Sequence, residues 1–343
     1  MLASEQALPE LALPPLDLRA LARRGAIPAL VAAAAVGVIV LAGPRMHVFT
    51  AALSHALHAN PAWALLAVVF ECVSLAGYVG LLWLVAGRAA PRVDIRASAQ
   101  ITFTGAGATR LLPTAGAGGA AVAIWALRRA GMNTAAAART LLTFFVLLYS
   151  FFLTATAGFG AALTLGLVRG HGPTVMSAVA SAVAVAAIVL SLVFAWRVRA
   201  DRAGAGRLRR GAQLVGLAVR DALALVRSRD LRLVGAATYW IFDAAVLWAM
   251  LSALGSSPSL PVVALAYLLG QVANTLPIPG SVSGGMTGVL IAWGVPAELA
   301  LPAVLAYRTV AVWLPTPAAL GAIPGLRATV ARWTREDAVA VAV

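Results

Sequence analysis

Long apolar runs constrain the fold of this sequence more than any other feature. They recur at residues 26–43, 62–87, 140–168, 174–196, 233–254 and 299–323. A helix needs about 20 apolar residues to cross a hydrocarbon core of about 30 Å. The chain is 62% hydrophobic with a mean hydropathy of +0.91, and only 11% of its residues are charged, unlike a soluble domain. We therefore expect an all-α, polytopic membrane bundle with about six full spans.

The basic residues indicate how the chain threads through the membrane. All of them are arginine, the formal net charge is +14, and the loop at 197–232 alone holds ten arginines. Because they lie in short loops between apolar runs, they are topology signals and do not predict a nucleic-acid-binding surface. Their distribution predicts a cytoplasmic N-terminal segment (1–25), a membrane domain (26–325) and a cytoplasmic tail (326–343). Within the basic loop, residues 213–226 predict a helix, either on the membrane surface or packed as an ordinary loop helix.

Two further segments are apolar but contain too many prolines and glycines for a continuous span. Residues 110–132 read RLLPTAGAGGAAVAIWALRRAGM, and residues 274–295 read NTLPIPGSVSGGMTGVLIAWGV. Both contain Leu-Pro-x-x-Gly, then Gly-Gly, an apolar stretch with one Trp, a terminating Gly and a following span that carries an arginine. Three spans separate the copies, and an odd number reverses the direction of entry. We expect two re-entrant helical hairpins within inverted repeats at about 62–168 and 233–323.

The glycine-rich starts of these half-helices have two interpretations. Half-helices that begin at mid-membrane leave backbone N–H groups at their N-termini, and such groups attract anions. Alternatively, the glycines serve only the close packing of helices. Irregular backbone in a membrane must be buried in protein or line a wet cavity. We therefore expect the tips, residues 113–119 and 277–285, to meet near the bilayer midplane.

Four ionisable residues fall within apolar segments: Glu71, Arg110, Asp243 and Arg308. A charge at the bilayer centre costs about 2.5–3.5 kcal/mol, so each needs a partner or a polar cavity. They form either two structural ion pairs or a polar pathway in which the arginines hold an anionic head group. The predicted lipid-binding or translocation residues are Glu71, Arg110, Pro113, Gly116, Gly118, Gly119, Asp243, Gln271, Asn274, Pro277, Pro279, Gly280, Gly284, Gly285, Tyr307 and Arg308.

Other reactive side chains are few. His55 and His58 lack a third ligand, so we expect no metal site. The single cysteine, Cys72, lies in an apolar run and is interpreted as a buried, inert thiol. The sequence shows no Ser-His-Asp set and no nucleotide-binding loop. We therefore expect neither an enzyme nor a bound cofactor.

Several stretches carry a family resemblance. The first broken segment, together with YWIFDAAVLWAMLSALG, AYLLGQVANTLPIPG and GGMTGVLIAWGVPAELALPAVLAYRTVAVWLP, resembles the lysylphosphatidylglycerol synthase transmembrane family over about residues 62–326. The Pro-x-Pro-Gly segment and the Tyr-Arg of the last span are the most specific parts. The resemblance implies a flippase-like fold that translocates lipid between leaflets. Fused members carry a cytoplasmic domain that makes aminoacylated phosphatidylglycerol; none is seen here, so we expect a stand-alone member without the synthase domain.

One departure from the family pattern concerns the second hairpin. Members resemble Pro-x-Pro-Gly-Gly-x-Gly followed by a short stretch with a Glu, whereas here Gly280 is followed by Ser281-Val282-Ser283 and no Glu. Either Glu71 or Asp243 takes the place of that carboxylate, or this member is altered in activity.

The leading hypothesis is a flippase-like protein of the bacterial cytoplasmic (inner) membrane that binds or translocates an anionic phospholipid or a lipid-linked substrate. The alternative is a non-transporting envelope scaffold that docks a lipid-modifying or glycosyl-transferring enzyme. Candidate protein partners are a second copy of the chain or such an enzyme, and no nucleic acid is expected.

Overall fold

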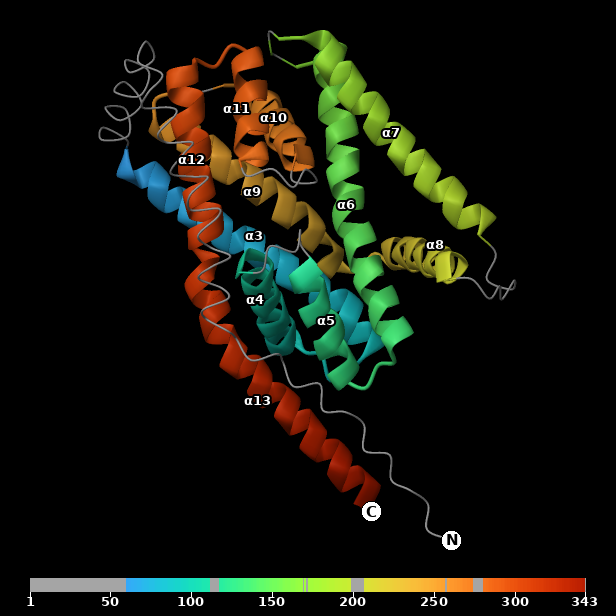
Figure 1. Ribbon diagram of the computed structural model, residues 1–343. Helices are drawn as coiled ribbons and strands as arrows, with labels where there is room; N and C mark the ends of the chain where they lie inside the picture. The colour runs from blue at the N-terminus through green and yellow to red at the C-terminus, as the bar shows by residue number, and fades with distance from the viewer. Residues whose placement is uncertain are drawn as a thin grey trace. The chain divides into compact units, whose positions relative to one another are not determined.

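The computed structural model describes residues 60–111, 117–168, 170, 172–198, 207–256, 258–273 and 280–342 (Figure 1). All regular structure within these ranges is helical, as predicted. The helices are α3 (Pro61–Ala89), α4 (Ile95–Leu111), α5 (Ala117–Arg129), α6 (Thr134–Thr164), α7 (Thr174–Arg197), α8 (Arg207–Arg227), the 3₁₀-helix η2 (Leu231–Leu233), α9 (Val234–Ala253), α10 (Leu260–Val272), α11 (Ser281–Ala292), α12 (Ala297–Trp313) and α13 (Pro315–Ala342).

Within the described ranges, five helical stretches are long and apolar enough to cross a membrane. They are α3, α6, α7, η2 with α9, and α12 continued by α13. These stretches match five of the six predicted runs, and the sixth, 26–43, lies outside the described residues together with His55 and His58. α13 continues to Ala342, so most of the predicted tail is helical. The prolines 315 and 317 lie in the first turn of α13, where a missing N–H is tolerated.

Local sequence signals set several helix ends. Asn60 and Asn133 cap α3 and α6, their side chains accepting hydrogen bonds from the backbone N–H of Ala62 and Ala136. The predicted terminating glycines, Gly131 and Gly294, follow α5 and α11 with φ values of +99° and +85°. That left-handed conformation favours glycine, which explains why each half-helix stops there.

Helices α3 and α9 pack antiparallel. Asn60 N–H donates to the Ala253 carbonyl near one end, and the Ser74 hydroxyl donates to the Tyr239 carbonyl near the middle. The two helices approach closely at Gly77 and Gly235, where a Cβ on Gly77 would lie 2.7 Å from the carbonyl oxygen of Gly235. Small residues at such crossings allow close contact between membrane helices.

Cys72 occupies the other side of α3. It is exposed, on the same helix as the exposed Leu65 and Val69. The prediction of a buried thiol is therefore wrong. In a span, an exposed apolar side faces lipid, so the apolar run around Cys72 reflects lipid contact and not burial in protein.

Each short helix pair lies against a long helix from the other predicted repeat or the segment that follows it: α4 against α13, and α10 against α6. α4 packs on α13, where Thr329 donates a hydrogen bond to Gln100 of α4 at 2.8 Å and Arg92, in the turn before α4, pairs with Asp337 at 2.5 Å. Figure 1 shows that α5 and α11 run in opposite directions, each into the long helix that follows.

The basic loop forms α8, which packs on α6 and α7. Ala218, Val219 and Ala222 are buried against the bundle, whereas Val215, Leu223 and Val226 are exposed, so both the surface and the packed-loop interpretations stay open. Arg220 of α8 donates to the carbonyls of Ala195 and Val198 at the end of α7, at 2.8 and 2.7 Å. A cation there satisfies carbonyls that have no partner within α7 and complements the helix dipole.

Candidate functional site

The first short helix pair, α4 and α5, is held together by a glycine contact. Gly119 donates its backbone N–H to the Thr109 hydroxyl at 3.1 Å. A Cβ on Gly119 would lie 2.5 Å from that hydroxyl and 2.9 Å from the carbonyl oxygen of Gly105. No side chain fits at Gly119 without separating the two helices.

The second pair, α10 and α11, repeats this contact with different neighbours. A Cβ on Gly285 would lie 3.4 Å from the Cα of Gly270, and a Cβ on Gly270 would lie 3.0 Å from the backbone nitrogen of Met286. Gly284, in contrast, has no atom of the described residues within 4 Å of its Cβ position. Among the described residues, Gly285 is therefore the packing glycine of this pair. Gly280 has φ +82° immediately before α11, in the left-handed region.

A buried group of acidic and tyrosine side chains lies between α3, α9, α10 and α12. We call it the carboxylate–tyrosine cluster and define it as Glu71, Tyr239, Asp243, Tyr267 and Tyr307. Glu71 is 4% exposed, Asp243 5%, Tyr267 0% and Tyr307 1%. Both carboxylates lie away from the ends of spanning helices, where a charge needs compensation.

Asp243 is held by the second helix pair. The Tyr267 hydroxyl of α10 donates a hydrogen bond of 2.5 Å to Asp243 Oδ2. Among the described residues, the other oxygen, Oδ1, is buried and has no hydrogen-bond partner. Burying a polar atom without a partner costs free energy, and the Tyr307 hydroxyl lies within interaction range of the same carboxyl.

The cluster continues from α10 to α12. The rings of Tyr267 and Tyr307 meet edge to face with centroids 6.0 Å apart. Gln271, one turn beyond Tyr267 on α10, donates from Nε2 to the Tyr307 hydroxyl at 3.2 Å. The predicted residues Gln271 and Tyr307 thus lie together, joined to Asp243 through Tyr267.

The remaining predicted charges are Glu71 and Arg308. Tyr239 and Tyr307 lie within electrostatic range of both Glu71 and Asp243. Arg308, half-buried beside Tyr307, lies within electrostatic range of Asp243. Within the described part of the chain, however, no arginine nitrogen lies within 4 Å of the Asp243 carboxylate. A direct Arg308–Asp243 ion pair, one form of the structural interpretation, is therefore not formed.

The structure leaves part of the predicted site untested. Pro113, Gly116, Asn274, Pro277 and Pro279 lie outside the described residues, and so does most of each predicted tip. Arg110 belongs to α4, but its side chain is not described. Gly118 is in the first turns of α5 and is buried beside Gly119.

Sequence reasoning missed Tyr267, the residue that joins Asp243 to the second helix pair. A signal was available: Tyr267 and Gln271 are four residues apart and therefore share one helix face. It also missed Trp240, whose indole N–H donates to the Leu148 carbonyl of α6 at 2.8 Å. A Tyr or Trp side chain costs little free energy within an apolar segment, so neither residue stands out in the sequence as a charged residue does.

Comparison with known proteins gives a family assignment. A search of the curated proteins gave no match. The family model of the lysylphosphatidylglycerol synthase TM region matches residues 23–319, which include every described helix from α3 to α12. The match also includes Asp243, Tyr267 and both short helix pairs. The chain therefore belongs to the family of the lysylphosphatidylglycerol synthase transmembrane region.

Proposed function

We propose that this protein is a flippase-like membrane protein that binds an anionic lipid and moves it between leaflets. A transport role, without catalysis, is part of the proposal. The observation that carries it is the carboxylate–tyrosine cluster, because buried ionisable residues inside spanning helices mark substrate or ion pathways more often than they serve stability. Tyr267 and Gln271 connect this cluster to the second short helix pair.

The two short helix pairs support an inverted repeat of re-entrant hairpins. α10 and α11 have 13 and 12 residues, so each is about 20 Å long or less, too short for a core of about 30 Å. The glycine contacts Gly105–Gly119 and Gly270–Gly285 occupy equivalent places in the two pairs. The opposite directions of α5 and α11 are those that an inverted repeat requires.

The arginine distribution supports an orientation. Arg88, Arg128, Arg129 and the arginines of α8 border spans on the side that the positive-inside rule assigns to the cytoplasm. We place both termini in the cytoplasm and the protein in a bacterial inner membrane.

The cluster suggests how a phosphate could cross. Arg308 is a guanidinium, which suits a phosphate bidentately, and it lies within electrostatic range of Asp243. The arriving phosphate makes the direct ion pair with Arg308 that Asp243 does not make, and without lipid the negative charge of Asp243 compensates Arg308 from a distance. The exchange keeps Arg308 compensated throughout, while the hydroxyls of Tyr267 and Tyr307 replace part of the head group's hydration.

The direct test is leaflet exchange in vesicles. The purified protein is reconstituted with fluorescent phosphatidylglycerol or phosphatidylcholine, and the externally accessible fluorescence is quenched over time. We expect faster exchange of the anionic lipid, a loss with Arg308→Ala and partial retention with Arg308→Lys. Arg129→Ala, an exposed arginine at the end of α5, is the matched control and leaves exchange unchanged.

Three outcomes contradict parts of the proposal. If the folded protein shows no leaflet exchange of lipid but binds a lipid-modifying enzyme, the result supports the alternative function as a non-transporting scaffold. Unchanged lipid binding in both Arg110→Ala and Arg308→Ala removes the arginine site. Restoration of a folding defect of Arg308→Ala by Asp243→Asn assigns these two residues a structural role.

A further inference from the structure

A second feature, which shares no residue with the cluster, is an open cavity of about 690 Å³ between α3, α6 and α8. Arg88, Arg139, Thr140 and Asp221 form part of its polar lining, and Leu214 and Leu217 of α8 belong to its apolar lining. Its volume is in the range of sites for small amphipathic molecules. None of the residues of the carboxylate–tyrosine cluster lines it.

The charges around this cavity are arranged in two ion-pair groups. Arg139 of α6 donates from Nε and Nη2 to the two Asp221 oxygens of α8, both at 2.5 Å. This bidentate pair satisfies Asp221 and fixes α8 against α6.

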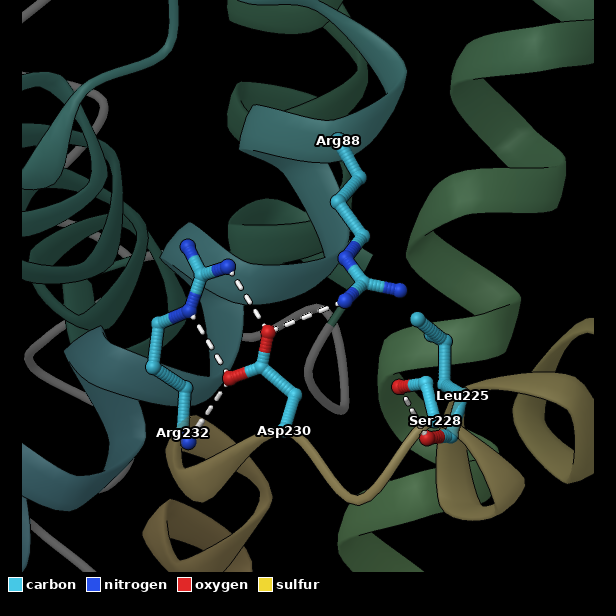
Figure 2. A network of polar contacts seen from close by, with 5 residues as sticks. All are labelled: Arg88, Leu225, Ser228, Asp230 and Arg232. Carbon is cyan, nitrogen blue, oxygen red and sulfur yellow. Dashed lines mark hydrogen bonds and ion pairs between the residues drawn. The ribbon is translucent and has the colours of Figure 1, made fainter.

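The second group contains one carboxylate and two guanidiniums, as Figure 2 shows. Asp230 accepts from Arg232 Nη2 at 2.8 Å and from Arg88 Nη2 at 3.0 Å. Arg232 also lies 4.7 Å from the centre of the Trp83 ring. Counting both groups, three guanidiniums meet two carboxylates, so the rim keeps an excess positive charge. Arg88, whose side chain is 44% exposed and which shares Asp230 with Arg232, is the least compensated of the three.

The position of the cavity along the helices indicates its depth. Arg88 lies in the last turn of the candidate span α3, and Arg139 lies in the second turn of the candidate span α6. The ends of spans lie at the level of lipid head groups. Cationic side chains at that level, in one cavity with the leucines of α8, match a molecule with a negative head and an apolar body.

We propose that this cavity holds an anionic phospholipid of one leaflet as a second, peripheral site. Its phosphate contacts Arg88 and the Arg139 guanidinium, and the upper part of its acyl chains lies against Leu214 and Leu217. The site goes beyond the proposed translocation, because it retains lipid at one face of the membrane and uses no residue of the carboxylate–tyrosine cluster.

The test measures lipid binding to the full-length protein after removal of co-purified lipid. Phosphatidylglycerol is titrated against the wild type, Arg88→Gln and Arg128→Gln, with phosphatidylcholine in parallel. Loss of one charge-assisted contact predicts about a tenfold weaker affinity for phosphatidylglycerol in Arg88→Gln. Arg128→Gln, an exposed arginine that does not line the cavity, leaves the affinity unchanged.

A double variant guards against misfolding. Arg139→Gln with Asp221→Asn replaces the ion pair by two amides that can still hydrogen-bond, and it also weakens phosphatidylglycerol binding. Equal affinity of wild type and Arg88→Gln overturns the site. So does equal binding of phosphatidylcholine, and so does full competition by glycerol phosphate or inorganic phosphate, which makes the ligand a free anion. Leaflet exchange and its dependence on Arg308 are measured separately, so failure of one proposal leaves the other standing.

Discussion

Alanine at Gly270 should loosen the second helix pair, whereas alanine at Gly284 should not. A Cβ at residue 270 would overlap the Met286 Cγ and would lie 3.0 and 3.1 Å from the backbone nitrogen and Cα of Met286. The side chain of methionine can move, but the backbone of α11 can move only by shifting the helix. A Cβ at Gly284 meets no atom of the described part of the chain within 4 Å. Both changes are glycine to alanine in one helix pair, so they form a matched comparison.

The expected magnitude follows from two opposing effects. Glycine to alanine within a helix stabilises by up to about 1 kcal/mol, and both variants gain this. Overpacking at a filled contact costs about 1–3 kcal/mol, and only Gly270→Ala incurs it. We therefore expect Gly284→Ala to be neutral or slightly stabilising. The free energy of unfolding of Gly270→Ala should fall about 1–3 kcal/mol below that of Gly284→Ala.

The assay is unfolding in mixed micelles, followed by tryptophan fluorescence, alongside leaflet exchange in vesicles. Gly119→Ala in the first pair should behave like Gly270→Ala, because its Cβ would lie 2.9 Å from the Gly105 carbonyl oxygen. Equal unfolding free energies for Gly270→Ala and Gly284→Ala would refute the reasoning. The contact between α10 and α11 would then be looser than the structure shows.

Three further predictions concern the cluster, the basic face and the orientation. Tyr267→Phe should lower the free energy of unfolding by about 1.5–3 kcal/mol if Asp243 is charged, and by much less in an Asp243→Asn background. A double-mutant cycle measures this difference, and additive effects of the two changes would mean that the 2.5 Å hydrogen bond contributes nothing. The hydrogen bonds that Arg232 donates to Asp230, with the charge of Arg88, hold the pKa of that carboxyl well below its usual range. Its folded-state pKa is depressed, so its stabilisation is present above about pH 4 and is lost as the pH falls further; Asp230→Asn should therefore flatten the acid limb of the stability profile below about pH 4. A cysteine at position 204 in a Cys72→Ser background should resist labelling from outside intact cells, and ready labelling there would reverse the threading.

The positions of the long helices could be predicted from sequence because lipid leaves few alternatives. A segment without water must satisfy its backbone internally, so apolar runs of sufficient length become helices. The run at 174–196 corresponds to α7, Thr174–Arg197, almost residue for residue. α13 was harder to predict, since its last part carries charges and resembles a solvated tail. Its attachment to α4 through Asp337 and Thr329 depends on partners more than 200 residues away, which no local pattern reveals.

The candidate site could be predicted at the positions where a charged side chain carries a high free-energy cost in the membrane. Glu71 and Asp243 stood out because a carboxylate in an apolar run demands a reason, and both are buried in the structure. Their environment was not predictable in the same way. The partner of Asp243 is Tyr267, whose ring is compatible with an apolar segment and whose hydroxyl reveals its role only when α9 and α10 are placed together.

The choice between Gly284 and Gly285 shows what a closer reading of the sequence could have added. A Gly-Gly pair places its two members about 100° apart around a helix, so only one can face a given neighbour. The buried residues of α11 are Val282, Met286, Val289 and Leu290, spaced as one helix face. Gly285 lies three residues after Val282 and four before Val289, on that face, whereas Gly284 lies on the opposite side. The apolar periodicity of α11 therefore already pointed to Gly285 as the packing glycine, a distinction that is lost when the two glycines are treated as one motif without a helical phase.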